Sequence, residues 1–162
     1  MARTFRKGAV GALLDEYERA IEELKKLIEP IPDQDLTLIL DPNTDDENCK
    51  SLQTILTHVV YAGFGYATII HNSKGHQQGR PDKAYHLRIQ DYIRDLEDVF
   101  TFTENVFRDI QDGELLRYEE SLKIKTRWGQ SYDIEQLIEH AIVHILRHRR
   151  QTERLYVMRD PG

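Results

Sequence analysis

Cysteine is almost absent from this sequence: Cys49 is the only one among 162 residues, so an internal disulfide is excluded. Long apolar runs are absent too. Residues 51–73 carry no acidic or basic side chain besides histidines, but Gln53, three threonines and two glycines make them unlike a membrane span. Residues 8–14 are too short an apolar stretch for a secretory signal, so residues 3–14 are interpreted as the start of a first helix. These absences predict a cytoplasmic protein without a membrane span.

Positive charge is in deficit. The 22 lysines and arginines are outnumbered by 28 aspartates and glutamates, which gives a net charge of −6. A nucleic-acid-binding protein needs a positive face to neutralise phosphates, so this balance disfavours one. Hydrophobic residues make up 40% of the chain and charged residues 31%, which predicts a folded globule. The length suits one domain, and we expect residues 1–162 to form it.

Several motifs that define common catalytic sites are missing as well. The sequence has neither His-Glu-x-x-His nor Glu-x-x-His, which disfavours a zinc-protease site and a ferritin-type di-iron site. It also has no glycine-rich phosphate-binding loop. Any chemistry that the chain performs must therefore depend on another set of side chains.

Apolar residues recur at three- and four-residue steps in four segments, which predicts four amphipathic helices. These cover approximately residues 3–28, 51–72, 82–110 and 133–156. Ser51 is the predicted N-cap of the second helix, and Asp133 with Gln136 forms a predicted capping box on the fourth. Four long helices, each with one apolar face, predict an all-α fold: a four-helix bundle with long connections.

Three smaller features add detail to this prediction. Gly63 and Gly65 each weaken the second helix by about 1 kcal/mol, so they indicate the close approach of another helix or a local kink. Residues 36–40 of the long first connection are expected to pack onto the bundle. Residues 122–127 alternate between apolar or neutral and charged side chains, which is compatible with a short strand.

Three of the seven histidines, His140, His144 and His148, are spaced four residues apart on the fourth predicted helix. Side chains in this relation stand one turn above each other, so two imidazoles can reach a single metal ion. On a helical wheel the histidines lie beside the apolar stripe, and His58 lies at the margin of the apolar face of the second helix. Two helices that pack through adjoining apolar faces bring such margins together. A metal site in the bundle is the resulting hypothesis.

Ordinary roles compete with this hypothesis. A single histidine at the margin of a core is usually hydrogen-bonded or half-exposed, although burying two neighbouring imidazoles is costly unless something binds them. His71, His76 and His86 lie in or near a polar turn and are expected to be solvated. Cys49, next to Lys50 in a polar loop, is either a reactive thiol or an incidental residue.

Two motifs and their positions resemble those of the DinB/YfiT-like superfamily of metalloenzymes. The first is L-x-x-I-L-x-H-V-V over residues 52–60, and the second is H-x-x-x-H-x-x-x-H-R-x-Q over residues 140–151. The helix number, the length and the pair Trp128-Gly129 before the last helix agree as well, so the resemblance covers nearly the whole chain. The histidine signature of the last helix is its most specific part.

The resemblance implies a divalent metal, such as zinc, nickel, iron or manganese, held by one histidine of the second helix and two of the fourth. By position these are His58, His144 and His148. His140 would then either support the ligands from beside them or lie at the surface, and Gln151 would help to orient a ligand. Many relatives carry glycine where this chain has Arg150, a departure that leaves the ligands intact and bears on the local packing and the pocket rim.

Three protein ligands leave coordination positions open, which is the catalytic rather than the structural arrangement. Some branches of the superfamily are similar to thiol-dependent S-transferases that use mycothiol, bacillithiol or glutathione, and one is a maleylpyruvate isomerase. The resemblance thus implies a homodimeric enzyme in which the metal activates a low-molecular-weight thiol, or water as in a hydrolase, to attack a small-molecule substrate.

Two other classes of function stay open at this point. A non-catalytic metal- or ligand-binding stress-response protein would have a closed or apolar pocket. A binding patch for an anionic partner could use four arginines near the C-terminus, although the macrodipole also favours cations in a last helical turn. The four residues are Arg147, Arg149, Arg150 and Arg154.

Overall fold

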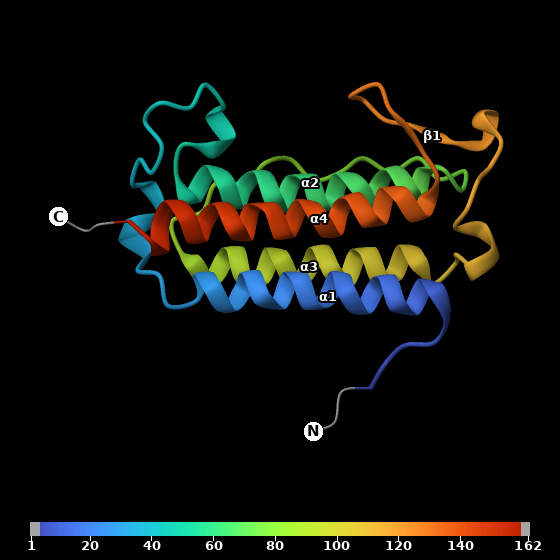
Figure 1. Cartoon of the computed structure of the whole chain (residues 1–162), viewed down its shortest axis with the longest axis horizontal. Helices are drawn as coiled ribbons and strands as arrows, with labels where there is room; N and C mark the ends of the chain where they lie inside the picture. Colours follow the sequence, from blue (N-terminus) through green and yellow to red (C-terminus); the bar gives the residue numbers. More distant parts are fainter. Residues whose placement is uncertain (1–3, 160–162) are drawn as a thin grey trace.

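The computed structural model describes residues 4–159, and four long helices packed along a common axis form most of it (Figure 1). The prediction of an all-α four-helix bundle is confirmed. The helices are α1 (Gly8–Ile28), α2 (Leu52–Asn72), α3 (Ile89–Phe107) and α4 (Ile134–Thr152).

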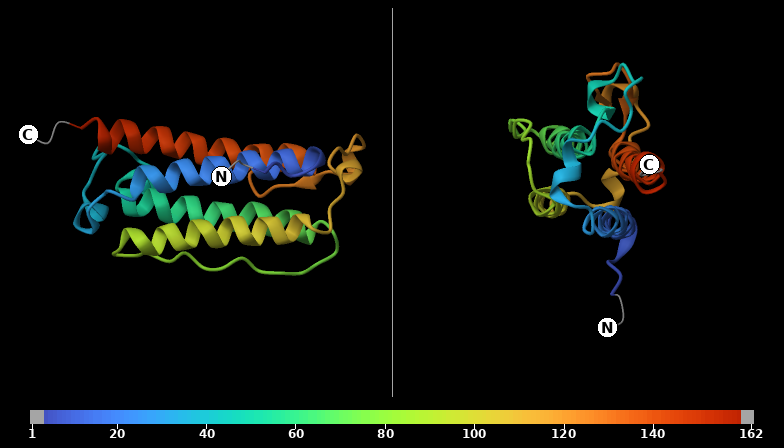
Figure 2. Two further views of the ribbon diagram at one scale, coloured as in Figure 1. Left: turned by 90° about the horizontal axis from the view of Figure 1, so that it is seen from below. Right: turned by 90° about the vertical axis from the view of Figure 1, so that its left-hand side faces the viewer.

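The long connections decide how the four helices are arranged. Around the bundle, α2 contacts α3 and α4, and α1 contacts the same two helices, so α3 and α4 lie diagonally opposite each other (Figure 2). Residues 73–88 run back along the whole length of α2, and α3 therefore starts at the same end as α2 and runs parallel to it (Figure 1). As a result, the first half of α2 lies beside the second half of α4.

The helix starts follow the predicted caps at two places. The Ser51 side chain accepts a hydrogen bond from the Thr54 backbone N–H, and the Thr54 hydroxyl accepts one from the Ser51 N–H. Asp133 and Gln136 form the same reciprocal pair at the start of α4. Each pair satisfies backbone donors that a helix start leaves free, so both boundaries are fixed locally.

The first helix is shorter at its N-terminal end than predicted. Residues 4–7 are not helical, and Arg3 lies outside the described residues. Arg6 instead turns back onto the bundle, where its guanidinium contacts Asp15 at 2.6 Å, Glu18 at 2.9 Å and Glu104 at 2.7 Å. These three carboxylates hold residue 6 in a position that a continued helix would not allow.

The third helix also begins and ends inside its predicted range. Residues 82–88 are extended because side chains of α2 and α3 bind their backbone: Thr57 donates to the Ala84 carbonyl, Gln53 donates to the His86 carbonyl, and Tyr92 accepts from the His86 N–H. These bonds replace the ones that a helix would form. At its C-terminal end α3 stops at Phe107, before the predicted Ile110.

The remaining segments are short. The predicted strand is two residues long: β1 (Ile124–Lys125) pairs antiparallel with β2 (Ser131–Tyr132). Of residues 36–40, Leu36 is fully buried and Leu40 packs partly buried against the core, whereas Leu38 and Ile39 are exposed, so the expectation for this stretch holds in part. A short 3₁₀ helix, η2 (Glu47–Cys49), precedes α2, and a π-helical turn, η5 (Glu153–Val157), follows α4. Both lie near the same end of the bundle.

Among the described residues, no helix has the length and apolar character needed to cross a membrane.

Of the two alternatives that the sequence left open for Gly63, a helix approach or a kink, the structure shows a close approach, and the neighbouring helix is α3. A Cβ atom at this position would lie 2.6 Å from Cγ1 of the buried Val99. Gly65 lies under the side chain of Arg80, where a Cβ would come within 2.5 Å of a guanidinium nitrogen. Glycine at these two positions thus lets neighbouring groups approach the α2 backbone.

We expect Gly63→Ala to lower the free energy of unfolding by about 1 kcal/mol, since overpacking costs about 1–3 kcal/mol and the gain in helix propensity is about 1 kcal/mol. Urea denaturation measures the change. Gly79→Ala is the control, because a Cβ there meets nothing within 4 Å. A variant about 1 kcal/mol more stable than wild type would contradict the tight α2–α3 contact, because only the gain in helix propensity would then remain.

Candidate metal centre

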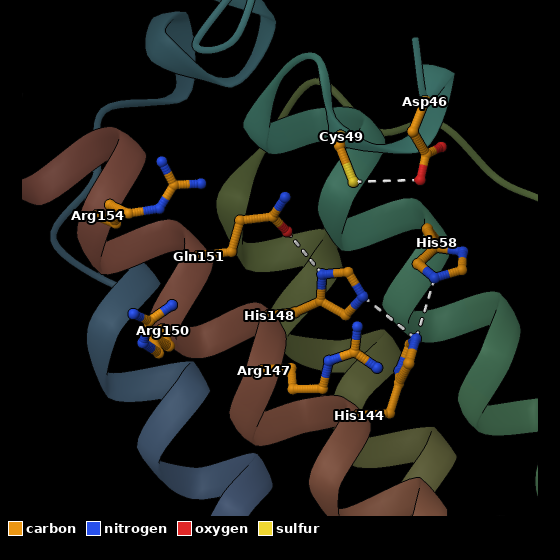
Figure 3. Close-up of a pocket in the computed structure, with 9 residues that line it drawn as sticks. All are labelled: Asp46, Cys49, His58, His144, Arg147, His148, Arg150, Gln151 and Arg154. Carbon is orange, nitrogen blue, oxygen red and sulfur yellow. Dashed lines mark hydrogen bonds between the residues drawn. The ribbon is translucent and has the colours of Figure 1, made fainter. Parts of the chain in front are cut away.

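Three histidines from two helices meet at the end of the bundle where α2 begins and α4 ends (Figure 3). His58 comes from the first half of α2, and His144 and His148 come from successive turns of α4. Both helices are held together by fully buried apolar residues that include Ile55 and Ile145. The three candidate ligands predicted from the sequence are therefore brought together.

The Nε2 atoms of the three rings point at one another. The Nε2 atom of His144 lies 3.0 Å from that of His58 and 3.2 Å from that of His148. Each of the three histidines offers one nitrogen as a possible metal ligand, and these three nitrogens all lie within 4.8 Å of one another. This geometry could hold a metal ion, since a zinc ion takes imidazole nitrogens at roughly 2.0–2.1 Å.

Hydrogen bonding between neutral rings cannot satisfy this arrangement. The Nε2 atom of a neutral imidazole either donates one hydrogen or offers one lone pair. His144 Nε2 faces two other nitrogens, so a single hydrogen or lone pair must serve both contacts. A cation would accept the lone pairs of all three nitrogens, which makes it the better partner for the set.

Burial keeps the rings uncharged. His144 is buried with 8% of its surface exposed, and His58 and His148 are half-buried. Loss of water, with a smaller effect of His148, lowers the pKa of His58 to about 4. The same desolvation, helped by the neighbouring histidines, lowers the pKa of His144 further, and it lowers that of His148 despite the bond to Gln151. Neutral imidazole is the form that binds metals.

Gln151 fixes the orientation of one ring. Its Oε1 lies 2.8 Å from Nδ1 of His148, and a carbonyl oxygen can only accept, so Nδ1 carries the hydrogen. The lone pair of His148 is then on Nε2, directed at the other two histidines. This is the contact expected of a residue that supports a metal ligand.

His140 lies one turn before His144 and outside the three-histidine group. Its ring stacks on Trp128 at 5.6 Å between centroids, and burial lowers its pKa. Tyr66 connects the two regions, since its ring lies 5.3 Å from His140 and 5.6 Å from His144. His140 therefore borders the candidate ligands through an aromatic contact.

Outside this region the other histidines differ in part from the prediction. His71 and His76 stack on each other at 3.8 Å, and His76 is exposed. His86 is not simply solvated, because its Nε2 lies 2.6 Å from Oδ2 of Asp95 and the residue is half-buried. The correction has a clear origin: the extended backbone of residues 82–88 places His86 against α3.

A cavity of about 410 Å³ opens beside the three histidines. The other residues that line it are Asp46, Cys49, Arg147, Arg150, Gln151 and Arg154. Cys49 reaches the cavity because η2 folds over the start of α2, which no local pattern in the sequence indicates. Its thiol lies 3.4 Å from Oδ2 of Asp46, and burial raises its pKa, so the thiol is protonated near neutral pH.

His58 also lines a second cavity of about 460 Å³. This cavity is more apolar, and the aromatic side chains of Tyr61, Tyr66 and Trp128 form part of it. The buried hydroxyl of Thr68, another of its lining residues, has no hydrogen-bond partner among the described residues. The candidate centre thus borders two spaces of different polarity.

Comparison with known proteins bears on the family of the chain. No curated protein matches the chain. The model of the DinB family, in contrast, matches residues 2–159, which is nearly the whole sequence. The chain therefore belongs to the DinB family.

Proposed function

We propose that His58, His144 and His148 hold one divalent metal ion and that the protein is a metal-dependent enzyme acting on a small molecule. The observation that carries the proposal is the convergence of three neutral imidazoles, whose candidate ligand atoms all lie within 4.8 Å of one another. Family membership supports it as well. We also propose that residues 1–162 form one domain, since the four described helices share one hydrophobic core.

The donor set restricts which metals fit. Three imidazole nitrogens suit zinc, nickel or ferrous iron better than manganese, which prefers oxygen ligands and binds such sites most weakly among these metals. When bound, such an ion supplies Lewis acidity that lowers the pKa of a thiol or water beside it. The residues of the chain keep the imidazoles neutral, orient His148 and reduce the access of water.

Two observations favour an enzyme over a non-catalytic metal- or ligand-binding stress-response protein. Three protein ligands leave coordination positions free, and the histidines border an open cavity of about 410 Å³ rather than a closed core. In addition, His58 lines both this polar cavity and the apolar one. A transfer reaction has to bring two molecules together, so a thiol in one cavity and an electrophile in the other would suit a thiol S-transferase better than a hydrolase.

Metal analysis tests this proposal directly. Protein purified without chelators or nickel resin should contain about one divalent metal ion per chain by elemental analysis. Chelator-treated protein would be titrated with zinc in a calorimeter. His148→Gln should weaken zinc binding by more than about 100-fold, because losing a residue that only supports a ligand weakens binding by up to about 100-fold. Gln151→Leu should weaken it by about 10–100-fold.

His76→Gln is the matched control, because it removes an exposed histidine from the segment that follows α2, away from the three-histidine group. It should leave zinc affinity unchanged. Equal zinc affinity of wild type and His148→Gln, with both folded by circular dichroism, would refute the metal site.

Acid should destabilise the metal-free protein through these same rings. The pKa of His58 is about 4 in the folded chain, against 6.5 for an ordinary histidine. Between these values the unfolded state binds a proton that the folded state does not. The contribution of His58 is therefore intact above pH 6.5 and decreases as the pH falls toward 4.

Urea denaturation of chelator-treated protein at several pH values measures this dependence. The free energy of unfolding of wild type should fall more steeply than that of His58→Gln, and the comparison cancels the titration of carboxylates common to both. Parallel curves for the two proteins would show that His58 is not desolvated.

A further inference from the structure

Three arginines face the polar cavity without a partner. Arg147, Arg150 and Arg154 are exposed, line the cavity, and make no ion pair or side-chain hydrogen bond with residues 4–159. They follow one another at three- and four-residue steps and so share one face of α4 and η5 over roughly 10 Å. Figure 3 shows the Arg147 guanidinium turned toward His144, Arg154 near Gln151, and Arg150 farther from the three histidines.

Neighbouring arginines from the same end of the chain are neutralised. Arg149, on another face of α4, forms ion pairs with Glu23 of α1 and with Glu153. Arg159 lies 3.2 Å from Asp35. The macrodipole explains why cations collect near a helix C-terminus, but it does not explain why only those that face the cavity lack a carboxylate. The difference points to a role for the unpaired guanidinium groups.

The one acidic residue of the cavity can offset only one of the three arginine charges. Asp46 lies on the opposite wall, and its two carboxylate oxygens accept hydrogen bonds from the Asn48 N–H and the Cys49 thiol. Three neutral imidazoles would also leave the charge of a divalent ion uncompensated. The space between the histidines and the arginines is therefore strongly positive, although the whole chain has a net charge of −6.

We infer that the substrate, or the thiol that attacks it, carries a carboxylate or phosphate group that Arg150 and Arg154 bind while its reactive end faces the three histidines. This inference rests on the proposed function and specifies its ligand class. Guanidinium groups bind planar carboxylates and phosphates through paired hydrogen bonds. A cavity of about 410 Å³ also has the size of a small-molecule site.

Two thiols that differ in charge test the inference. We would titrate cobalt-loaded protein with 3-mercaptopropionate and with its neutral amide, following the cobalt absorption spectrum as the binding signal. The anionic thiol should bind wild type at least about 10-fold more tightly, as expected when a charge-assisted bond is gained. In R150Q/R154Q the two thiols should bind with nearly equal affinity, so that the ratio of their dissociation constants is close to one.

R94Q/R108Q is the charge-matched control. It removes two exposed arginines from α3 and its C-cap, on the side of the bundle diagonal to α4, and should keep the preference of wild type. All three proteins should bind cobalt, and R150Q/R154Q at least as tightly as wild type, because it loses only cations. Succinate and inorganic phosphate, as competitors of 3-mercaptopropionate, distinguish a carboxylate site from a phosphate site.

The possible failures are distinguishable. If no protein binds cobalt, the proposed function fails. The anion site is then tested by thermal unfolding, in which succinate or phosphate should stabilise wild type more than R150Q/R154Q. If neither anion does so, this inference fails as well. If cobalt binds but both thiols bind wild type equally, the inference alone is overturned. Displacement of the thiol by a 20-base-pair DNA duplex, with a steep salt dependence, would also overturn it by assigning the arginines to a polyanion.

Discussion

Three uncharged imidazoles sharing one poorly hydrated space are the constraint on which this structure depends. His144 is buried, and its Nε2 is 3.0 Å from one ring nitrogen and 3.2 Å from another. The buried His144 Nε2 cannot make a hydrogen bond to both neighbouring rings while all three are neutral, so the arrangement has an energetic cost without a cation. The apolar contact between α2 and α4 must hold the rings together against that cost.

The bundle topology makes such a contact possible. Because residues 73–88 return along the bundle, α3 takes the place opposite α4, and α2 is left free to pack against α4 on its other side. The uncharged surface of α2 allows close packing on two helices, with Gly63 admitting Val99 of α3. His58 then lies on the α4 side, at the edge of the core instead of inside it. A site at an edge is held by rigid helices and still opens to a cavity.

Local patterns in the sequence predicted much of this, and tertiary contacts explain the rest. The caps at Ser51 and Asp133 involve residues three apart, so they could be found without knowing the fold. Likewise, periodicity located the four helices. The predicted start of the third helix was wrong because Thr57, which is distant in sequence, donates a hydrogen bond to the backbone carbonyl of residue 84. The entry of Cys49 into the cavity depends on a loop fold that has no local signal. The metal ligands and the homodimer remain predictions.

The charge of the groups around the histidines connects the site to its ligand. Carboxylates often support metal-binding histidines, and their negative charge makes the ligand more basic. Here the supporting group of His148 is the uncharged carbonyl of Gln151, and arginines occupy the accessible side of the cavity. Protein groups thus orient the imidazoles without neutralising a bound cation. Such a cation would keep most of its positive charge and so its ability to polarise a nucleophile. Because the protein supplies so little negative charge here, the electrostatic balance of the site is left to the molecule that enters it.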